Sequence, residues 1–362
     1  MERVLHIIAG LGSGGAESIV MNYYRFINRE KIQFDFLVRN SAQHRFDDEI
    51  TKYGGKIYYT APFPKRTLRN IYEVYKFFKK HKEYNIIHVH ANSLMYIVPL
   101  IIAKKNGVKC RIIHCHSTHS QKKIFNIIHY FNRMLIGKYA NIFIACSKDA
   151  GKWMFRDNEY IILNNGIDIS KFKYDIQIRN EIRKEFKIED KFVIGHVGRF
   201  SYEKNHGFVL DIFEEILKKQ SNAVLMLVGE GELFDKIKRK SIEMNIGDKV
   251  IFTGVRSDVN KLMLAMDVFL FPSIYEGLPL TLIEAQASGL PCVVSNVITK
   301  EVNVTNNINY LDLNQDIKEW ANCVLSLFNF KRIDTGNMIK DAGYDISLEA
   351  KKLEKLYLGG IE

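Results

Sequence analysis

Short apolar runs alternate with amphipathic segments along the chain, and this alternation predicts strands and helices in turn. Apolar runs bounded by turn residues are typical of parallel strands that are buried on both faces. The expected strands are Val4–Ile8, Phe34–Val38, Ile86–His90, Arg111–His116, Asn141–Cys146, Ile161–Leu163, Phe192–Val197, Ala223–Val228, Val250–Phe252 and Val268–Phe271. Because the series restarts at Phe192, we expect an α/β protein with two Rossmann-like halves.

Helices are expected where apolar residues recur at helical spacing. These segments are Ala16–Asn28, Leu68–Lys82, Gln121–Tyr139, Leu280–Ser288 and Leu348–Leu358. The polar segment Asp168–Glu185 divides the two series of strands and is expected to be a linker. A length of 362 residues suits two domains. We therefore expect one domain at residues 1–170 and a second at residues 171–345.

Charge is distributed unevenly between the two halves. Residues 1–170 carry 26 Lys and Arg against 13 Asp and Glu, which gives +13, and residues 171–362 carry 26 against 28, which gives −2. This asymmetry predicts an anionic partner for the N-terminal half, either nucleic acid or an anionic membrane surface. Basic residues are seldom interleaved with aromatic ones, which disfavours nucleic acid.

Two of the expected helices, Leu68–Lys82 and Gln121–Tyr139, are both basic and amphipathic. The first places Ile71, Val74, Tyr75 and Phe78 on one face, and the second is built around Ile124, Phe125, Ile128, Phe131 and Leu135. Such a helix either lies on anionic lipid or packs on a sheet as an ordinary surface helix. The charge balance favours membrane contact, so we expect a peripheral protein at the cytoplasmic membrane.

The other membrane and compartment signals are weak. The sequence has no run of eighteen or more apolar residues, so we expect no transmembrane helix. The N-terminal segment reads as a strand and lacks the layout of a signal peptide. The five cysteines form no C-x-x-C pair, which is typical of small buried side chains in a reducing cytoplasm.

A glycine-rich loop follows the first expected strand. Gly10, Gly12 and Gly15 match the G-x-G-x-x-G pattern of dinucleotide-binding folds. Such a fold needs an acid at the end of the second strand, where this chain has Arg39 and Asn40. NAD is therefore disfavoured, and an NADP-dependent oxidoreductase that uses Arg39 remains an alternative.

Histidines gather at the end of the strand Arg111–His116, in the run from His114 to His119. Cys115 points away from His114 and His116 because side chains alternate along a strand, so these three ligands do not converge on a metal. Ligands of α/β proteins bind at the carboxyl ends of parallel strands. His116 is the better candidate for a ligand contact and His114 the fallback, and either is otherwise a satisfied core histidine.

Two carboxylates flank a turn after the strand Val268–Phe271. Glu276 precedes Gly277-Leu278-Pro279, and Glu284 lies in the expected helix that starts at Leu280. The amides at the start of a helix favour an anion, and carboxylates accept hydrogen bonds from vicinal hydroxyls. The layout therefore suits a ligand that carries both phosphate and sugar.

Two cations follow the strand Phe192–Val197. Arg199 offers a bidentate fork and Lys204 a compact point charge, and together they can clamp a diphosphate. The sequence contains no D-x-D motif, which fits a site where two cations take the place of a divalent ion. We therefore expect no metal cofactor.

These motifs resemble those of the family 4 retaining glycosyltransferases. Glu276 to Glu284 is similar to their E-x(7)-E motif, and Gly198 to Lys204 is similar to their G-R-x(4)-K motif. The resemblance extends from the glycine loop to the last helix. It implies the GT-B arrangement, in which two Rossmann-like domains have parallel sheets facing across a cleft. It also implies that a C-terminal helix, about residues 346–362, returns to the N-terminal domain.

The resemblance implies roles for particular residues in binding the nucleotide sugar. Glu276 would hold hydroxyls of the donor sugar and Glu284 those of the ribose, while Arg199 and Lys204 would neutralise the departing diphosphate. Backbone amides near Gly277, Leu278 and Leu280 would assist. Further contacts would come from Val255 and Arg256 at the nucleobase, and from Gly14, Gly15 and His116 near the donor phosphates and the acceptor.

The implied reaction is a retaining transfer from a nucleoside diphosphate sugar, with a UDP sugar expected. The glycine loop and the His-Cys-His strand are similar to those of bacterial enzymes of capsule, exopolysaccharide and O-antigen synthesis. The implied acceptor is an oligosaccharide on undecaprenyl diphosphate at the cytoplasmic face of the membrane. A GT-B-type sugar-nucleotide epimerase is the main alternative. Nothing in the sequence sets the oligomeric state.

Overall fold

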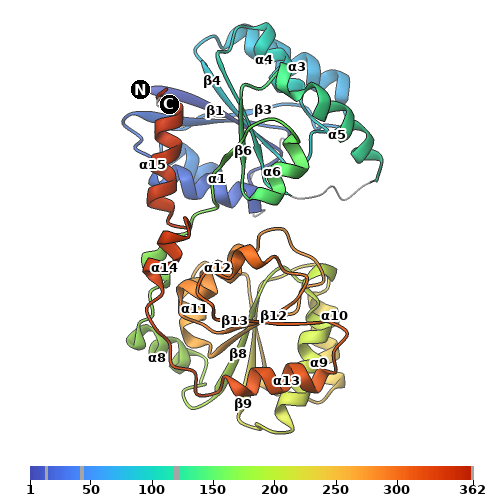
Figure 1. The fold of residues 1–362 in the computed structure, drawn as a ribbon, viewed down its shortest axis with the longest axis vertical. Coiled ribbons are helices and arrows are strands. Elements are labelled where there is room, and N and C mark those ends of the chain that lie inside the picture. The colour runs from blue at the N-terminus through green and yellow to red at the C-terminus, as the bar shows by residue number, and fades with distance from the viewer. Residues whose placement is uncertain (13–14, 41–44, 118–122, 360–362) are drawn as a thin grey trace. The chain divides into compact units, whose positions relative to one another are not determined.

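Two parallel sheets form the centre of this computed structural model, which describes residues 1–12, 15–40, 45–117 and 123–359. The first sheet has seven strands in the order β3-β2-β1-β4-β5-β6-β7, and the second has six in the order β10-β9-β8-β11-β12-β13 (Figure 1). One unit comprises residues 1–166 and 346–362, and the other comprises residues 167–345. The predicted α/β class with two Rossmann-like parallel sheets is confirmed.

The strands of both sheets are short and largely buried. Those of the first unit are β1 (Glu2–Ile8), β2 (Ile32–Val38), β3 (Ile57–Tyr59), β4 (Ile86–Ala91), β5 (Cys110–Cys115), β6 (Ile142–Ala145) and β7 (Ile161–Ile162). Those of the second unit are β8 (Phe192–Val197), β9 (Ala223–Val228), β10 (Val250–Gly254), β11 (Val268–Phe271), β12 (Cys292–Ser295) and β13 (Ile308–Leu311).

Helices connect these strands, as parallel strand order requires. In the first unit they are α1 (Gly15–Phe26), α2 (Asp47–Lys52), α3 (Thr67–Lys80), α4 (Val98–Lys105), α5 (Lys123–Leu135), α6 (Lys148–Phe155) and the C-terminal α15 (Ile346–Tyr357). In the second they are α7 (Ile169–Phe172), α8 (Ile176–Glu185), α9 (His206–Leu217), α10 (Phe234–Glu243), α11 (Val259–Ala265), α12 (Leu280–Ala287), α13 (Ile317–Ser326) and α14 (Gly336–Asp341). Single 3₁₀ turns lie at Ile136–Lys138, Tyr202–Lys204, Gly247–Lys249 and Lys300–Val302.

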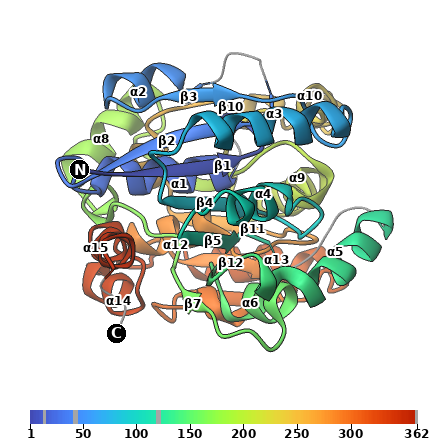
Figure 2. The ribbon, with the colours of Figure 1, turned by 90° about the horizontal axis from the view of Figure 1, so that it is seen from above.

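The two faces of the first sheet differ in chemistry. One face is an apolar core in which Ile87 and Val89 of β4 pack with residues of α3, α4 and α6. The helices α3 and α4 lie side by side there (Figure 1, Figure 2). The opposite face carries histidines from β1, β4 and β5, and side chains of α1 and α15 line the same small cavity.

The C-terminal helix α15 is tied to the first unit by hydrogen bonds. Glu354 accepts one from the backbone N–H of Asn28 at 2.6 Å, and Glu349 accepts one from the N–H of Asn164 at 3.1 Å. Gly166 sits at a close approach of the two chain segments, because a Cβ on it would lie 2.6 Å from Cα of Ile346. Side-chain and backbone contacts therefore both fix where α15 begins.

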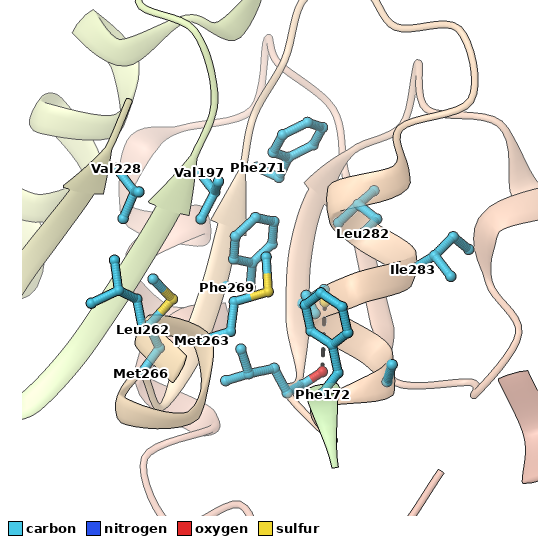
Figure 3. Packing of buried hydrophobic residues seen from close by; sticks show 14 of the residues in the cluster. Phe172, Val197, Val228, Leu262, Met263, Met266, Phe269, Phe271, Leu282 and Ile283 are labelled. Carbon is cyan, nitrogen blue, oxygen red and sulfur yellow. Dashed lines mark hydrogen bonds between the residues drawn. The ribbon is translucent and has the colours of Figure 1, made fainter. Parts of the chain in front are cut away.

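One of two apolar cores in the second unit lies between its sheet and the helices α7, α8, α11 and α12. Figure 3 shows Phe269 and Phe271 of β11 in this cluster, with Leu282 of α12 and Met263 of α11. These side chains are fully buried, which fixes α12 against the strand that precedes it. The helix that carries Glu284 is therefore mounted on a rigid core.

The expected linker at residues 168–185 is wrong, because this segment forms α7 and α8 within the second unit. Arg179 and Arg183 of α8 bind the Asp267 carboxylate at 2.5 and 2.6 Å. The same carboxylate accepts a hydrogen bond from the N–H of Val193 at the start of β8. The polar residues that read as a linker instead attach α8 to the sheet.

Candidate functional site

Lys204, predicted to bind the diphosphate, and Glu276, predicted to bind the sugar, meet at the point where the strand order of the second sheet reverses. The chain leaves β8 toward β9 on one side and reaches β11 on the other, and β8 and β11 are neighbours. In open parallel sheets the loops diverge at such a point and leave a crevice beyond the strand ends. Lys204 follows β8 and Glu276 follows β11, so both belong to that crevice.

Lys204 and Glu276 form an ion pair. Nζ of Lys204 lies 2.6 Å from Oε1 of Glu276, and the two side chains are only 18% and 14% exposed. The ammonium also lies 4.6 Å from the centroid of the Phe271 ring. Partial removal from water strengthens both interactions relative to an exposed pair. In the free protein, Lys204 is therefore held at the crevice by a carboxylate and a ring face.

Backbone hydrogen bonds join the two loops that carry this pair. The N–H of Ile274 donates to the carbonyl of Glu203 at 2.8 Å, and the side-chain amide of Asn205 donates to the carbonyl of Pro272 at 3.2 Å. The loop after β8 and the loop after β11 are thus fixed to each other. Their side chains need little ordering when a ligand arrives.

Two glycines allow the loop after β8 to lie this close to its neighbours. A Cβ on Gly198 would meet side-chain carbons of Lys204 at 3.2 and 3.3 Å and Nε2 of His196 at 3.3 Å. Gly229, which follows β9 with φ +133°, would place a Cβ 2.2 Å from the Gly198 carbonyl oxygen. The first glycine in the G-R-x(4)-K pattern therefore has a steric role beside Lys204.

Arg199, the second predicted clamp residue, is not brought to the Lys204–Glu276 pair. It is 73% exposed and pairs with Glu232 of the loop after β9, where the nitrogen and oxygen are 3.0 Å apart. Exposed pairs of this kind are worth only about 0–1 kcal/mol. Its guanidinium is therefore free to exchange Glu232 for a ligand anion at little cost.

Val255 and Arg256, predicted at the nucleobase, follow β10 on the same edge of the sheet. Val255 is exposed. The Arg256 guanidinium is already bound by Asp258 at 2.7 and 2.8 Å and by Glu185 at 3.4 Å. Arg256 is therefore engaged within the protein, and only backbone groups and the Val255 side chain remain for a base.

The start of α12 is the candidate anion-binding element. The helix begins at Leu280 after Pro279 and Gly277, and the first-turn amides of a helix lack intrahelical partners. A Cβ on Gly277 would meet nothing within 4 Å. Leu278 packs against the hydrophobic core, so its contribution to a ligand would come from its backbone.

Glu284 lies on the second turn of α12 and is half-buried. Its carboxylate has no ion-pair or hydrogen-bond partner within the described ranges, and removal from water raises its pKa to about 7. A carboxyl group in this state gains from any ligand hydroxyl that donates to its charged form. This property matches the hydroxyl-binding role that was predicted for it.

In the first unit the strand order reverses between β1 and β4, beside the glycine-rich loop. Gly15 is the first residue of α1, and a Cβ on it would meet nothing within 4 Å. Gly14, the other predicted loop residue, lies outside the described residues.

The two predicted histidines differ in exposure. His114 is fully buried within β5, so it is a core histidine and cannot face a ligand at the surface. His116 follows the end of β5, is half-buried, and shares a hydrogen bond with His90 at 2.9 Å. Burial lowers the pKa of His116 to about 4, so it is neutral at physiological pH. His116 is the one of the two that reaches the edge of the sheet.

The sequence interpretation missed three further histidines that lie beside this pair. His6 of β1 and His88 and His90 of β4 occupy the same face of the sheet as His114 and His116. The missed signal was the i, i+2 spacing of histidines in two strands. It becomes informative only when those strands are known to be neighbours.

The predicted basic helices expose more apolar surface than expected. Ile71 and Tyr75 of α3, expected on the packed face, are exposed, and Val74 and Phe78 make the core contact. The expected helix Gln121–Tyr139 is α5 followed by a 3₁₀ turn, and it exposes Ile127, Ile128, Tyr130, Phe131 and Met134. None of the helices in the described part of the chain has the length and apolar character needed to cross a membrane.

Models of two protein families match the chain. The family described as Glycosyltransferase Family 4 matches residues 13–171, and that described as Glycosyl transferases group 1 matches residues 177–343. These two matches follow one another along the chain. Together they cover most of its length.

Curated relatives and solved structures agree with the family matches. A putative glycosyltransferase, EpsF, of Bacillus subtilis is 34% identical over 339 residues, covering 89% of this chain and 87% of the relative. An Escherichia coli UDP-Gal:alpha-D-GlcNAc-diphosphoundecaprenol alpha-1,3-galactosyltransferase is 27% identical, covering 81% and 80%. The crystal structure of Anabaena HepE with UDP and glucose superposes with a TM-score of 0.79 at 17% identity, covering both chains fully. At this sequence identity, the similarity to HepE establishes the fold alone.

Proposed function

The chain belongs to the family 4 glycosyltransferases, and we propose that it transfers a sugar from a UDP sugar to a lipid-linked oligosaccharide with retention of the anomeric configuration. The printed activity of the Escherichia coli relative supports this choice of donor and of a diphosphoundecaprenol carrier. The product would extend a capsule, exopolysaccharide or O-antigen chain.

The observation that carries the proposal is the ion pair between Lys204 and Glu276 at the switch point of the second sheet. A nucleoside diphosphate sugar presents an anion and a hydroxylated ring next to each other. Lys204 would leave Glu276 for the diphosphate, and the freed carboxylate would accept hydrogen bonds from the sugar hydroxyls. One buried pair would thus become two ligand contacts, with neither charge left uncompensated.

Charge neutralisation of the leaving group is the proposed source of catalysis. As the bond from the anomeric carbon to the diphosphate oxygen breaks, its electron pair leaves with UDP and negative charge grows on the phosphate. Lys204, Arg199 and the first amides of α12 would stabilise that charge. A divalent ion is unnecessary in this scheme because two side-chain cations do its work.

Retention follows if the acceptor hydroxyl attacks the anomeric carbon on the face that UDP leaves. The new carbon–oxygen bond forms as the old one breaks, and the hydroxyl proton passes to the departing phosphate oxygen. This route needs no nucleophile from the protein. We assign acceptor binding to Gly15 and His116 of the first unit, where the His116 ring is neutral at physiological pH.

We also infer that the first unit binds an anionic lipid surface. A groove of about 510 Å³ between α3 and α4 is lined mainly by apolar residues, among them Leu68, Tyr72 and Ile101. Leu68 is 84% exposed, and the lysines and arginines at positions 65, 66, 69 and 76 of the same segment are exposed as well. Exposed apolar side chains together with exposed cations complement an anionic membrane, which would keep the enzyme near a lipid-linked acceptor.

Transfer in vitro tests the proposed function. The purified chain is incubated with individual UDP sugars and a short lipid-linked saccharide in the presence of EDTA, and the product is analysed by NMR for its anomeric configuration. We expect one UDP sugar to give a product, and the anomeric configuration of that product should be the same as that of the donor. An inverted product, or conversion of the donor without any acceptor, would contradict the proposal, the latter pointing to an epimerase.

A further inference from the structure

Five histidines gather on one face of the first sheet. They come from neighbouring strands, since His6 of β1 lies opposite His88 of β4, and His90 of β4 lies opposite His114 of β5. His116 adds a fifth ring at the end of β5. The rings of His90, His114 and His116 have centroids 4.1 to 5.6 Å apart. One potential ligand atom from each of these three lies within 4.8 Å of those of the other two.

Hydrogen bonds among the rings leave several nitrogens unused. His6 Nδ1 meets His90 Nε2 at 2.9 Å, and His88 Nε2 meets His114 Nδ1 at 3.2 Å. Nε2 of His114 and Nδ1 of His116 are buried and lack a partner among the described residues. A buried polar atom without a partner destabilises the folded state. Packing alone gives no reason to collect such groups in one place.

We propose that His90, His114 and His116 bind a zinc ion. Imidazole nitrogens are favoured ligands of Zn²⁺, and three histidines with an open fourth position form a familiar zinc site. Ligand nitrogens of a tetrahedral zinc ion lie about 3.3 Å apart. Nδ1 of His90 and Nε2 of His116 are already 2.9 Å apart, so a small opening of this pair admits the ion.

The remaining two histidines would each form a hydrogen bond to one of the zinc ligands. A zinc-bound histidine usually uses its second nitrogen in a hydrogen bond that fixes the ring. His6 would serve His90 in this way, and His88 would serve His114. His88 is itself held by the hydroxyl of Tyr357 in α15, 2.6 Å from its Nδ1. The bound ion would thus be linked through His88 to the C-terminal helix.

His116 is half-buried, so the ion and its fourth ligand would enter from the His116 end of the cluster. No carboxylate belongs to this set within the described ranges, so the open position would take water or a small anion that offsets the double charge. The Lys204–Glu276 site lies in the other unit. Zinc here would stabilise the histidine cluster and take no part in neutralising the diphosphate.

Zinc uptake by the full-length chain, without a histidine tag and after treatment with a chelator, tests the inference. We expect isothermal titration with Zn²⁺ to show one ion per chain, and Co²⁺ to give the visible absorption of a tetrahedral site. His116→Gln and His114→Gln should each weaken binding at least tenfold. His6→Phe, which removes a supporting hydrogen bond, should weaken it about tenfold.

His81→Gln is the matched control, because His81 lies outside the cluster and pairs with Glu83. It should bind zinc as the wild type does. His116→Gln, at the half-buried end of the cluster, keeps the test valid if His114→Gln does not fold. Absence of stoichiometric zinc, or unchanged affinity in His116→Gln, would overturn the inference. The measurement uses no sugar substrate, so its failure leaves the proposed transfer reaction unaffected.

Discussion

Lys204 and Glu276 stand 2.6 Å apart at the ends of two neighbouring strands, β8 and β11, with both side chains mostly shielded from water. They are 72 positions apart in the chain and meet because the strand order reverses between them. In our proposal, donor binding replaces this pair with two separate contacts. In this proposal, the cation that binds the diphosphate, Lys204, is paired with the Glu276 carboxylate as long as no donor is bound.

This pairing predicts opposite effects of two alanine substitutions on UDP binding. Lys204→Ala removes a cation and should weaken UDP binding at least tenfold. Glu276→Ala releases Lys204 from its partner and should leave UDP affinity unchanged or raised a few-fold, while transfer falls at least a hundredfold because the sugar hydroxyls lose their acceptor. Titration calorimetry with UDP measures the effect on affinity, and a transfer assay measures the effect on activity. Equal loss of UDP binding in both variants would contradict this account.

The raised pKa of Glu284 predicts a pH-dependent donor affinity. Burial lifts its pKa from 4.5 to about 7 in the free protein. Hydrogen bonds from the ribose to the carboxylate would favour the charged form and lower the pKa in the complex, so binding releases a proton. Affinity should therefore rise as pH increases toward 7 and level off above it, by about tenfold between pH 6 and pH 8.

Glu284→Gln provides the control for this pH effect. The variant cannot ionise, so its donor affinity should not vary with pH over that range. Calorimetry in two buffers of different ionisation enthalpy should detect the released proton in the wild type alone. A wild-type affinity that is flat with pH would show that Glu284 does not bind the donor in its charged form.

Gly198→Ala should impair transfer by displacing Lys204. Its Cβ would lie 3.2 Å from a side-chain carbon of Lys204, so the Lys204 side chain must shift by a few tenths of an ångström, which disturbs the placement of its ammonium. We expect UDP affinity to fall several-fold, with only a modest decrease in melting temperature. Gly207→Ala in α9 is the matched control, because its Cβ would lie 3.7 Å from Nζ of Lys240, which is an ordinary van der Waals contact. Equal behaviour of the two variants would argue against a steric role for Gly198.

Asp267→Ala should destabilise the second unit. The carboxylate binds both Arg179 and Arg183 and accepts the N–H of Val193, so its removal leaves two shielded cations unpaired. The free energy of unfolding should fall by about 3 kcal/mol. Asp190→Ala, which removes an exposed carboxylate 3.9 Å from Lys191, should change it by less than about 0.5 kcal/mol. Thermal unfolding distinguishes these outcomes, and a neutral Asp267→Ala would show that α8 is not attached through this carboxylate.

Membrane binding should depend on the exposed apolar side chains that line the groove between α3 and α4. The double substitution Leu68→Glu and Tyr72→Glu places two charges where apolar side chains face solvent. We expect co-sedimentation with anionic vesicles to fall at least tenfold, because both apolar contact and charge attraction are lost. Ile176→Glu, an exposed apolar position in the second unit, should have no effect. Binding of the wild type to neutral and anionic vesicles alike would contradict the role of charge.

The sequence predicted the elements whose local pattern is complete in itself. Phe192–Val197, Ala223–Val228 and Val268–Phe271 are strands with the expected bounds, because strands buried on both faces read as unbroken apolar runs. The start of α12 at Leu280, directly after Pro279, was also predicted from a local signal, because proline is favoured near the start of a helix. Where neighbouring residues alone decide the local structure, the sequence pattern is sufficient to predict the bounds of the element.

Features that depend on distant partners could not be predicted in this way. The helix α8 looks polar because Arg179 and Arg183 bind Asp267, which lies more than 80 positions away. Arg199 turns toward Glu232 because β9 places that carboxylate beside it. The histidine cluster depends on β4 pairing with β1 and β5, which no single segment of the sequence reveals.

The central claim is that Lys204 binds the diphosphate of the donor without a metal. Its most direct test is calorimetric titration of UDP into the wild type and Lys204→Ala, each in the presence of EDTA. We predict saturable binding to the wild type and at least tenfold weaker binding to the variant. Equal affinities, or wild-type binding that appears only when a divalent ion is supplied, would contradict it.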